Sequence, residues 1–264
     1  MTVDRYQRIA ALLEMLAKNG KVEVEQAVAA LGASAATIRR DLVYLDEQRL
    51  ARRTHGGAIA NSGSFDLPLR FKTGRALAEK QRIGAAAAAL APVGGIVGIN
   101  GGSTTLEVAR GLAARADLVS TEGAGRALTI VTNAVNVAGE LLVRPQFKVV
   151  VTGGVVRAHS YELFGPLAER SLESLSVELV FLGVDGFDAA FGASAHSEAE
   201  ASTNSMLALA AAKVVVVCDA SKVGRRAFAQ ICPPTKVDTL VTDTGVAPQV
   251  AAQLKSLGIK VIAV

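Results

Sequence analysis

Residues 34–58 read SAATIRRDLVYLDEQRLARRTHGGA, and this stretch predicts a helix that is followed directly by a short basic hairpin. Ser34 is a favourable N-cap residue for the helix. Apolar side chains then recur at helical spacing, at Ala35, Ile38, Leu42 and Leu45. We expect this face to pack against other helices and the opposite face to be exposed.

The face expected to be exposed suits the major groove of DNA. With a rotation of about 100° per residue, it carries Ala36, Arg40 and Val43, with Thr37 and Tyr44 beside them. Small side chains near the helix start allow a close approach to the bases, and an arginine can pair bidentately with a guanine edge. The helix is therefore a candidate reader of base sequence.

Basic side chains around this face are better placed for the DNA backbone. Arg39 lies toward the edge of the face, where it can reach a phosphate. The following residues, 50–59, contain short apolar positions and a Gly-Gly pair, and they predict a two-stranded wing. Within that wing, Arg52, Arg53 and His55 would lie along the backbone or a minor groove.

Two shorter amphipathic patterns precede this stretch. Apolar residues at helical spacing run from Tyr6 to Leu16, and Asn19-Gly20 follows them as a typical helix end. A second pattern covers residues 24–31 and ends at Gly32. Together the three helices predict a helix-turn-helix, although on periodicity alone three such helices are more often a plain bundle with a solvated arginine face.

Residues 37–59, TIRRDLVYLDEQRLARRTHGGAI, closely resemble the signature of the DeoR-type winged helix-turn-helix regulators, and the match extends back to Arg5. The resemblance implies a DNA-binding domain over residues 1–59, with double-stranded operator DNA as its partner. The DNA-binding residues that follow from it are Ser34, Ala36, Thr37, Arg39, Arg40, Val43, Tyr44, Arg52, Arg53 and His55.

Residues 60–75 interrupt the periodicity with Gly, Ser and Pro, which is typical of a linker. The family resemblance implies that this linker is a hinge between a DNA reader and a sensor. Residues 71–83 carry several Lys and Arg and are expected to form a charged helix that leads into the second domain, residues 76–264.

Strand-like and helical runs alternate along residues 76–264, which predicts an α/β domain. The strand-like runs are continuously apolar and rich in Val, as in a parallel sheet that is covered on both faces. The expected strands are Gly95–Ile99, Leu128–Val131, Lys148–Val151, Leu179–Val184, Val214–Cys218, Thr239–Val241 and Lys260–Val264. Helices are expected at Leu106–Ala114, Val135–Leu142, Glu198–Ala212 and Pro248–Leu257.

Polar and glycine-rich loops follow five of these strands. In an open parallel sheet such loops share the carboxyl edge, where ligands bind. Glycines there allow backbone N–H groups to approach an anion, and Ser103 opens a helix whose N-terminus favours phosphate. Lys222 can add a positive charge, and Asp185 can accept hydrogen bonds from hydroxyl groups. The loops therefore predict a site for a small, hydroxylated, phosphorylated ligand.

The runs NGGSTTLEVA, IVTNAVNVA, VVTGGVVR, GVDGFDAAFGAS and CDASKVGRRAF resemble, in this order, the sensor domain of the same DeoR family. The resemblance implies a fold related to ribose-5-phosphate isomerases and a phosphorylated sugar or polyol as the effector. The effector-binding residues that it implies are Asn100, Gly101, Gly102, Ser103, Thr104, Thr105, Asn133, Gly153, Gly154, Asp185 and Lys222.

Composition limits the location and the chemistry. The net charge of +4 is modest, and with only two cysteines a disulfide framework is not expected. The first residues enter a charged amphipathic pattern at once, unlike a secretory signal. We therefore expect a soluble cytoplasmic protein without a cofactor, and we expect no metal site because His159 and His196 lack suitable neighbours.

Three classes of function compete on these observations. The first is a ligand-responsive transcriptional regulator, a homodimer or homotetramer on symmetric half-sites, and the resemblance implies a repressor of a sugar or polyol operon. The second is a sugar-phosphate isomerase with an appended helical domain, using Asp185 and Glu198 as acid and base. The third is an interaction module that does not bind DNA. Only the first accounts for both halves of the chain, so we predict a regulator and not an enzyme.

Overall fold

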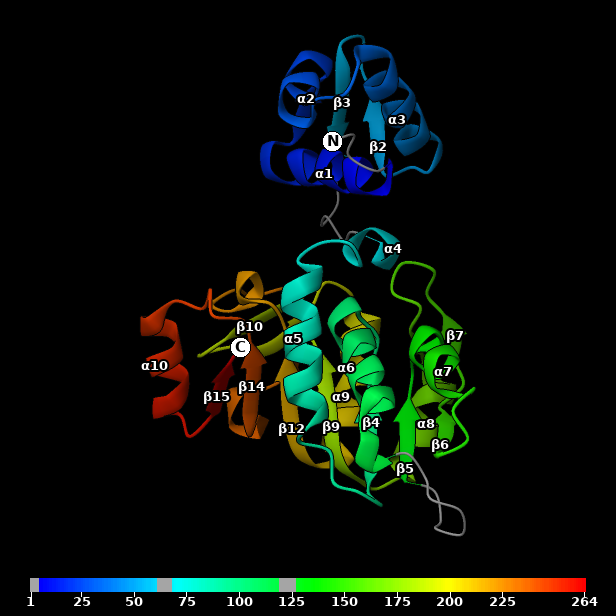
Figure 1. The fold of residues 1–264 in the computed structure, drawn as a ribbon, viewed down its shortest axis with the longest axis vertical. Helices are drawn as coiled ribbons and strands as arrows, with labels where there is room; N and C mark the ends of the chain where they lie inside the picture. The colour runs from blue at the N-terminus through cyan, green and yellow to red at the C-terminus, as the bar shows by residue number, and fades with distance from the viewer. Residues whose placement is uncertain (1–4, 61–67, 119–126) are drawn as a thin grey trace. The chain divides into compact units, whose positions relative to one another are not determined.

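The computed structural model describes residues 5–60, 68–118 and 127–264 of the 264-residue chain (Figure 1). The chain forms two compact units, Met1–Arg75 and Ala76–Val264. Each unit has its own hydrophobic core. Within the described residues, no helix is long and apolar enough to cross a membrane.

The N-terminal unit contains the three predicted helices and a small sheet. The helices are α1 (Arg5–Asn19), α2 (Val24–Leu31) and α3 (Ala35–Glu47). The wing strands β2 (Ala51–Arg53) and β3 (Gly57–Ala60) pair antiparallel, as predicted. A third strand, β1 (Lys21–Glu23), pairs with the other side of β3 and was not predicted, because three residues between two helices carry no period of their own.

The segment expected to be a linker contributes to the core of this unit. Leu69–Lys72 form the short helix α4, and Phe71 packs into the core with only 2% of its surface exposed. The helix predicted over residues 71–83 is therefore wrong at its start. Ala76 has a left-handed backbone with φ of 48°, which a helix cannot pass through, and α5 (Leu77–Ala88) begins after it. The rest of the expected linker, residues 61–67, lies outside the described residues.

The C-terminal unit is built on a seven-stranded parallel sheet, as predicted. Its strands are β4 (Ile96–Ile99), β5 (Leu128–Thr132), β6 (Phe147–Val151), β9 (Val177–Gly183), β12 (Ala211–Val217), β14 (Thr239–Thr242) and β15 (Lys260–Ala263). Their order in the sheet is β15-β14-β12-β9-β4-β5-β6. The strand order reverses between β4 and β9, and in an open α/β sheet such a switch point opens a crevice at the carboxyl ends of the strands.

Helices cover both faces of this sheet (Figure 1). One core lies under α5, α6 (Ser103–Ala114) and α7 (Val135–Leu141), and the other lies under α8 (Pro166–Glu173), α9 (Glu198–Leu209) and α10 (Pro248–Ser256). Side chains of β9 alternate between them: Phe181 belongs to the first core, and its neighbours Val180 and Leu182 belong to the second. This two-sided burial explains why the strands are continuously apolar.

Two small sheets complete the unit. β10 (Gly186–Asp188), β11 (Gly192–Ala195) and β13 (Ala229–Cys232) form one, and β7 (Val155–Val156) pairs with β8 (Leu163–Phe164) in a hairpin. The 3-10 turns are Ala116–Leu118, Ala220–Lys222 and Pro234–Lys236.

Candidate functional site

The outward face of α3 presents the side chains predicted to read DNA. Ser34 caps the helix, because its Oγ accepts the Thr37 N–H at 3.2 Å. Ala36, Arg39 and Arg40 are exposed. Val43 is half-buried, and so is Tyr44, whose ring faces the guanidinium group of Arg5 at 4.9 Å. The exposed part of the face is therefore small and basic.

The wing places its cations on the surface as well. Arg52, Arg53 and His55 are exposed, and the Arg53 N–H donates to the Asp46 carboxylate at 3.2 Å, which ties β2 to α3. Within residues 5–60 and 68–75, no ion pair engages the side chains of Arg39, Arg52 or Arg53. These guanidinium groups are available for phosphates.

A buried carboxylate fixes α3 to α1, and sequence reasoning did not single it out. Asp41 is 3% exposed and accepts from the Arg8 guanidinium group, whose Nη2 lies 3.3 Å from Oδ1. The signal was present in the sequence: Asp41 stands on the apolar stripe, between Ile38 and Leu42. A carboxylate is tolerated there only with a cationic partner.

The carboxyl edge of the large sheet collects the predicted effector loops. Because all seven strands run parallel, the residues after β4, β5, β6, β9 and β12 lie at one edge of the sheet. The loops after β4 and β9 flank the switch point. The structure thus places all of the predicted effector-binding residues at this edge: Asn100 to Thr105, Asn133, Gly153-Gly154, Asp185 and Lys222.

Several of these residues already have structural roles. The Asn100 side chain spans the switch point, accepting the Gly183 N–H at 2.7 Å and donating to the Gly183 carbonyl at 3.0 Å. A Cβ on Gly154 would lie 2.7 Å from the Phe164 carbonyl oxygen, so this glycine is required by the β7–β8 hairpin. The Asp185 carboxylate accepts the His196 N–H at 3.1 Å. These three residues hold the structure of this edge whether or not they touch a ligand.

Other residues keep unused polar groups at this edge. Ser103 and Lys222 are half-buried, and among the described residues neither the Ser103 hydroxyl nor the Lys222 ammonium group has a hydrogen-bond or ion-pair partner. Asn133 is fully buried and its Oδ1 has no partner there either. A hydroxyl at the start of α6, a lysine and a spare amide oxygen are suitable groups for a phosphorylated sugar.

Glu162 is the main residue of this edge that sequence reasoning missed. It immediately precedes β8, is 3% exposed, and accepts the Gly101 N–H at 2.7 Å through Oε1. The Asn204 amide also donates to it, at 3.2 Å to Oε2, and Asn133 donates to the Asn204 amide oxygen at 3.0 Å. Burial raises the pKa of Glu162 well above its ordinary value, and the nearby carboxylate of Glu200 raises it further.

Glu200 has the cationic partner that Glu162 lacks in these contacts. The Arg157 guanidinium group donates to Glu200 at 2.9 Å, and the Ser160 hydroxyl also bonds to that carboxylate. Arg157 and Ser160 lie in the turn of the β7–β8 hairpin. This hairpin therefore carries both Glu162 and Arg157, the cation that pairs with Glu200. No motif in the sequence indicates these pairings, which join residues about 40 positions apart.

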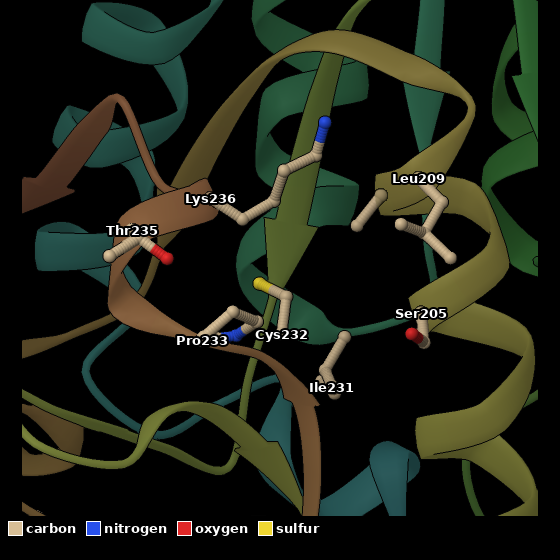
Figure 2. Close-up of a pocket in the computed structure, with 8 residues that line it drawn as sticks. Ser205, Leu209, Ile231, Cys232, Pro233, Thr235 and Lys236 are labelled. Carbon is tan, nitrogen blue, oxygen red and sulfur yellow. The ribbon is translucent and has the colours of Figure 1, made fainter.

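A pocket elsewhere in this unit contains none of the predicted effector residues. Figure 2 shows it between α9 and the segment from β13 to Lys236, with Cys232 and Leu209 in its wall. The Lys236 ammonium group donates to the Ala211 carbonyl at 3.0 Å, so this pocket adjoins the first residue of β12, at the opposite end of that strand from Lys222. Burial raises the pKa of Cys232 to about 11, which leaves its thiol unreactive at neutral pH.

Comparison with known proteins identifies the family to which this chain belongs. The family model for the DeoR-like helix-turn-helix domain matches residues 8–64, and the model for the DeoR C terminal sensor domain matches residues 75–244. The chain belongs to the DeoR family. Two curated relatives extend over nearly the whole DeoR-family chain. The HTH-type transcriptional regulator GlpR of Haloferax volcanii is 32% identical over 257 residues, covering 97% of this chain and 96% of that protein. The glycerol-3-phosphate regulon repressor of Escherichia coli K12 is 30% identical over 237 residues, covering 90% of each.

Among solved structures, ribose 5-phosphate isomerase A of Methanocaldococcus jannaschii matches with a TM-score of 0.41 and 16% identity, over 56% of this chain and 54% of that one. The curated relatives are named as regulators and repressors, and none of these names describes an enzyme. This DeoR-family protein is therefore a DNA-binding transcriptional regulator. The isomerase hypothesis is not favoured, and Glu198, one of its two candidate catalytic residues, is exposed at the start of α9.

Proposed function

We propose that this protein represses a sugar or polyol catabolic operon and leaves its operator when a phosphorylated sugar or polyol binds the sensor. The observation that carries the proposal is the switch point of the sheet: the N-terminus of α6 with Ser103 and the loop with Lys222 lie at the same sheet edge, and neither side chain has a polar partner among the described residues. Anions bind readily at such helix starts. One of the two relatives is named a glycerol-3-phosphate regulon repressor, and this name supports a small phosphorylated ligand.

The proposed DNA contacts follow from the exposed face of α3 and the wing. Ala36, Thr37, Arg40 and Val43 read bases in the major groove, with Tyr44 beside them. The side chains of Arg39, Arg52, Arg53 and His55 hold the backbone, because they are exposed around that face and on the hairpin. Operators for paired readers are symmetric, so the active form is a homodimer or homotetramer in the cytoplasm.

Release follows from a shift between two arrangements of the winged domains. The effector binds one arrangement of the sensor more tightly, and that arrangement no longer matches the spacing of the operator half-sites. The ligand can shift the equilibrium only by its difference in affinity for the two arrangements.

Two linked measurements test the proposal. Fluorescence anisotropy with DNA from upstream of the protein's own gene, at several salt concentrations, is expected to show specific binding with a steep salt dependence. A thermal-shift screen of sugar and polyol phosphates, including glycerol 3-phosphate, is expected to find one stabiliser. That compound must then release the DNA in the anisotropy assay. A stabiliser that leaves DNA binding unchanged would contradict the release mechanism.

A further inference from the structure

The backbone N–H at the start of the candidate anion loop is already bonded to an acid of the protein. Glu162 Oε1 lies 2.7 Å from the Gly101 nitrogen, and a Cβ on Gly101 would lie 2.3 Å from Glu162 Cγ. Gly101 is therefore a glycine because the Glu162 side chain packs directly on it. The N–H predicted to approach an anionic effector approaches the carboxyl group of Glu162.

We infer that an anion binds at the loop from Gly101 to Ser103 together with a proton, which the Glu162 carboxyl group takes up. Glu162 is therefore protonated when an anion occupies the sensor. The inference rests on the proposed function, because it concerns the same effector site.

The charges around Glu162 favour this coupling. Two carboxylates lie near it, Glu200 on α9 and Asp185 after β9, and both raise its pKa. The cation on the same hairpin, Arg157, bonds to Glu200. The groups that hydrogen-bond to Glu162, the Gly101 N–H and the Asn204 amide, are uncharged.

An anion bound beside Gly101 would add negative charge next to this buried acid. Like charges in a poorly solvated site favour protonation of one of them. A protonated carboxyl group still accepts the Gly101 N–H through its carbonyl oxygen, and its O–H can donate to the anion or to a neighbouring acceptor. Binding with proton uptake therefore keeps the loop intact, whereas binding to the ionised form places two negative charges side by side.

The test uses sulfate and inorganic phosphate as probes on the full-length protein. Sulfate does not titrate between about pH 5 and 8, so any proton taken up during sulfate binding comes to the protein. Isothermal titration calorimetry in buffers of different ionisation enthalpy is expected to show uptake of up to one proton. The dissociation constant should rise by up to about tenfold per pH unit wherever Glu162 is ionised in the free protein. The Gly101 amide signal in NMR reports whether the anion occupies the loop.

Two variants locate the proton. Glu162→Gln keeps an oxygen acceptor for the Gly101 N–H and should bind sulfate with no pH dependence and no proton uptake. Glu173→Gln removes an acid from the exposed surface of α8 and should behave as the wild type. Should Glu162→Gln fold poorly, proton uptake by the wild type together with the carboxyl shift of labelled Glu162 decides the question.

The outcomes separate the inference from the proposed function. Sulfate that shifts the Gly101 amide without proton uptake overturns the inference and leaves the effector site standing. A sugar phosphate that releases DNA without perturbing Gly101 also overturns it, because the effector then binds elsewhere. If neither sulfate, phosphate nor any sugar phosphate binds the sensor, both the inference and the proposed effector response fail.

Discussion

The Asp41 carboxylate on α3 is buried against the Arg8 guanidinium group on α1, with Arg8 Nη2 3.3 Å from Asp41 Oδ1. The helix proposed to read bases is thus oriented by an ion pair as well as by apolar packing. Arg5 of α1 makes two further contacts with α3, because its Nε is 3.9 Å from Asp41 and its guanidinium group faces the Tyr44 ring. Two arginines of α1 therefore help to set the position of α3.

Asp41→Asn tests this dependence. Removing one partner of a buried ion pair costs about 3–5 kcal/mol, because the remaining charge loses the attraction that offset its desolvation. Hydrogen exchange in the full chain should show faster opening of α1 and α3, with the sensor amides unchanged. Glu47→Gln, an exposed acid on the same helix, is the control and should change nothing. Equal exchange in Asp41→Asn and wild type would show that apolar packing alone orients α3.

Arg40 and Arg39 offer a matched pair for DNA recognition, because both are exposed neighbours on α3. If Arg40 bonds a guanine edge, Arg40→Ala should cost about 1–3 kcal/mol on the operator and relax specificity at one base pair. Arg39→Ala should weaken binding to all sequences and lower the salt slope by about one. Anisotropy on the operator and on single-base variants measures both. An equal loss for Arg40→Ala on every sequence would reassign Arg40 to a phosphate.

Local patterns were sufficient to predict most of the fold. Runs such as VVVVC, 214–218, are apolar without alternation, and this property alone identified the strands of a sheet buried on both faces. The strand order was not predictable in the same way. The neighbouring positions of β4 and β9 depend on contacts between residues about 80 positions apart, such as Asn100 with Gly183.

In the candidate site, too, local features were predictable from the sequence and contacts between distant residues were not. Glycine-rich loops after strands are visible in the sequence because backbone approach requires glycine. The hydrogen-bond partner of Gly101 was not visible in the sequence, because Glu162 lies 61 positions away in a short hairpin without a motif. The sequence therefore predicted which loops meet at the edge, and it could not show that a protein carboxyl group already bonds to one of them.

Lys222→Ala tests the proposed contact with the effector phosphate. A hydrogen bond to a charged group contributes about 1.5–3 kcal/mol, so affinity for the phosphorylated stabiliser should fall by roughly ten- to a hundredfold. Calorimetry with that compound measures the change. Lys213→Ala is the control, since Lys213 is an exposed lysine near the other end of β12. Unchanged affinity in Lys222→Ala would remove Lys222 from the site.

Glu162 also predicts how stability depends on pH without any ligand. Its pKa is raised above the ordinary value of 4.5, mainly by burial, so the folded protein holds this proton more tightly than the unfolded chain. The contribution of Glu162 to the free energy of unfolding is fully present below about pH 4.5. It declines as the pH rises toward the folded pKa, because ionising the buried acid favours unfolding. Glu162→Gln should remove this decline.

Thermal unfolding of the wild type and Glu162→Gln, measured across this pH range, gives the comparison. The stability of the variant relative to the wild type should increase with pH. A constant difference would mean that Glu162 has the same pKa in the folded and unfolded chain, and that its carboxylate is stabilised by its hydrogen bonds after all.

Substitution of two helical glycines by alanine should change the free energy of unfolding in opposite directions. A Cβ on Gly84 in α5 would lie 2.5 Å from the Glu107 carbonyl group of α6, whereas a Cβ on Gly139 in α7 would meet nothing within 4 Å. Gly139→Ala should therefore raise the free energy of unfolding by about 0.5–1 kcal/mol, since alanine loses less backbone entropy in a helix. Gly84→Ala should lower it by about 1–3 kcal/mol, because α5 and α6 must separate.

Circular dichroism during thermal unfolding measures both stability changes. The effector assay then measures whether either substitution changes effector affinity. Because α6 begins at the Ser103 loop, forcing α5 away from α6 should also weaken effector binding in Gly84→Ala. Gly139→Ala leaves this helix contact untouched, so its effector affinity should equal that of the wild type. Stabilisation by both substitutions would mean that α5 and α6 are not held in close backbone contact. In that case the geometry of the anion loop would have to be fixed from the β4 side, through Asn100 and Gly183.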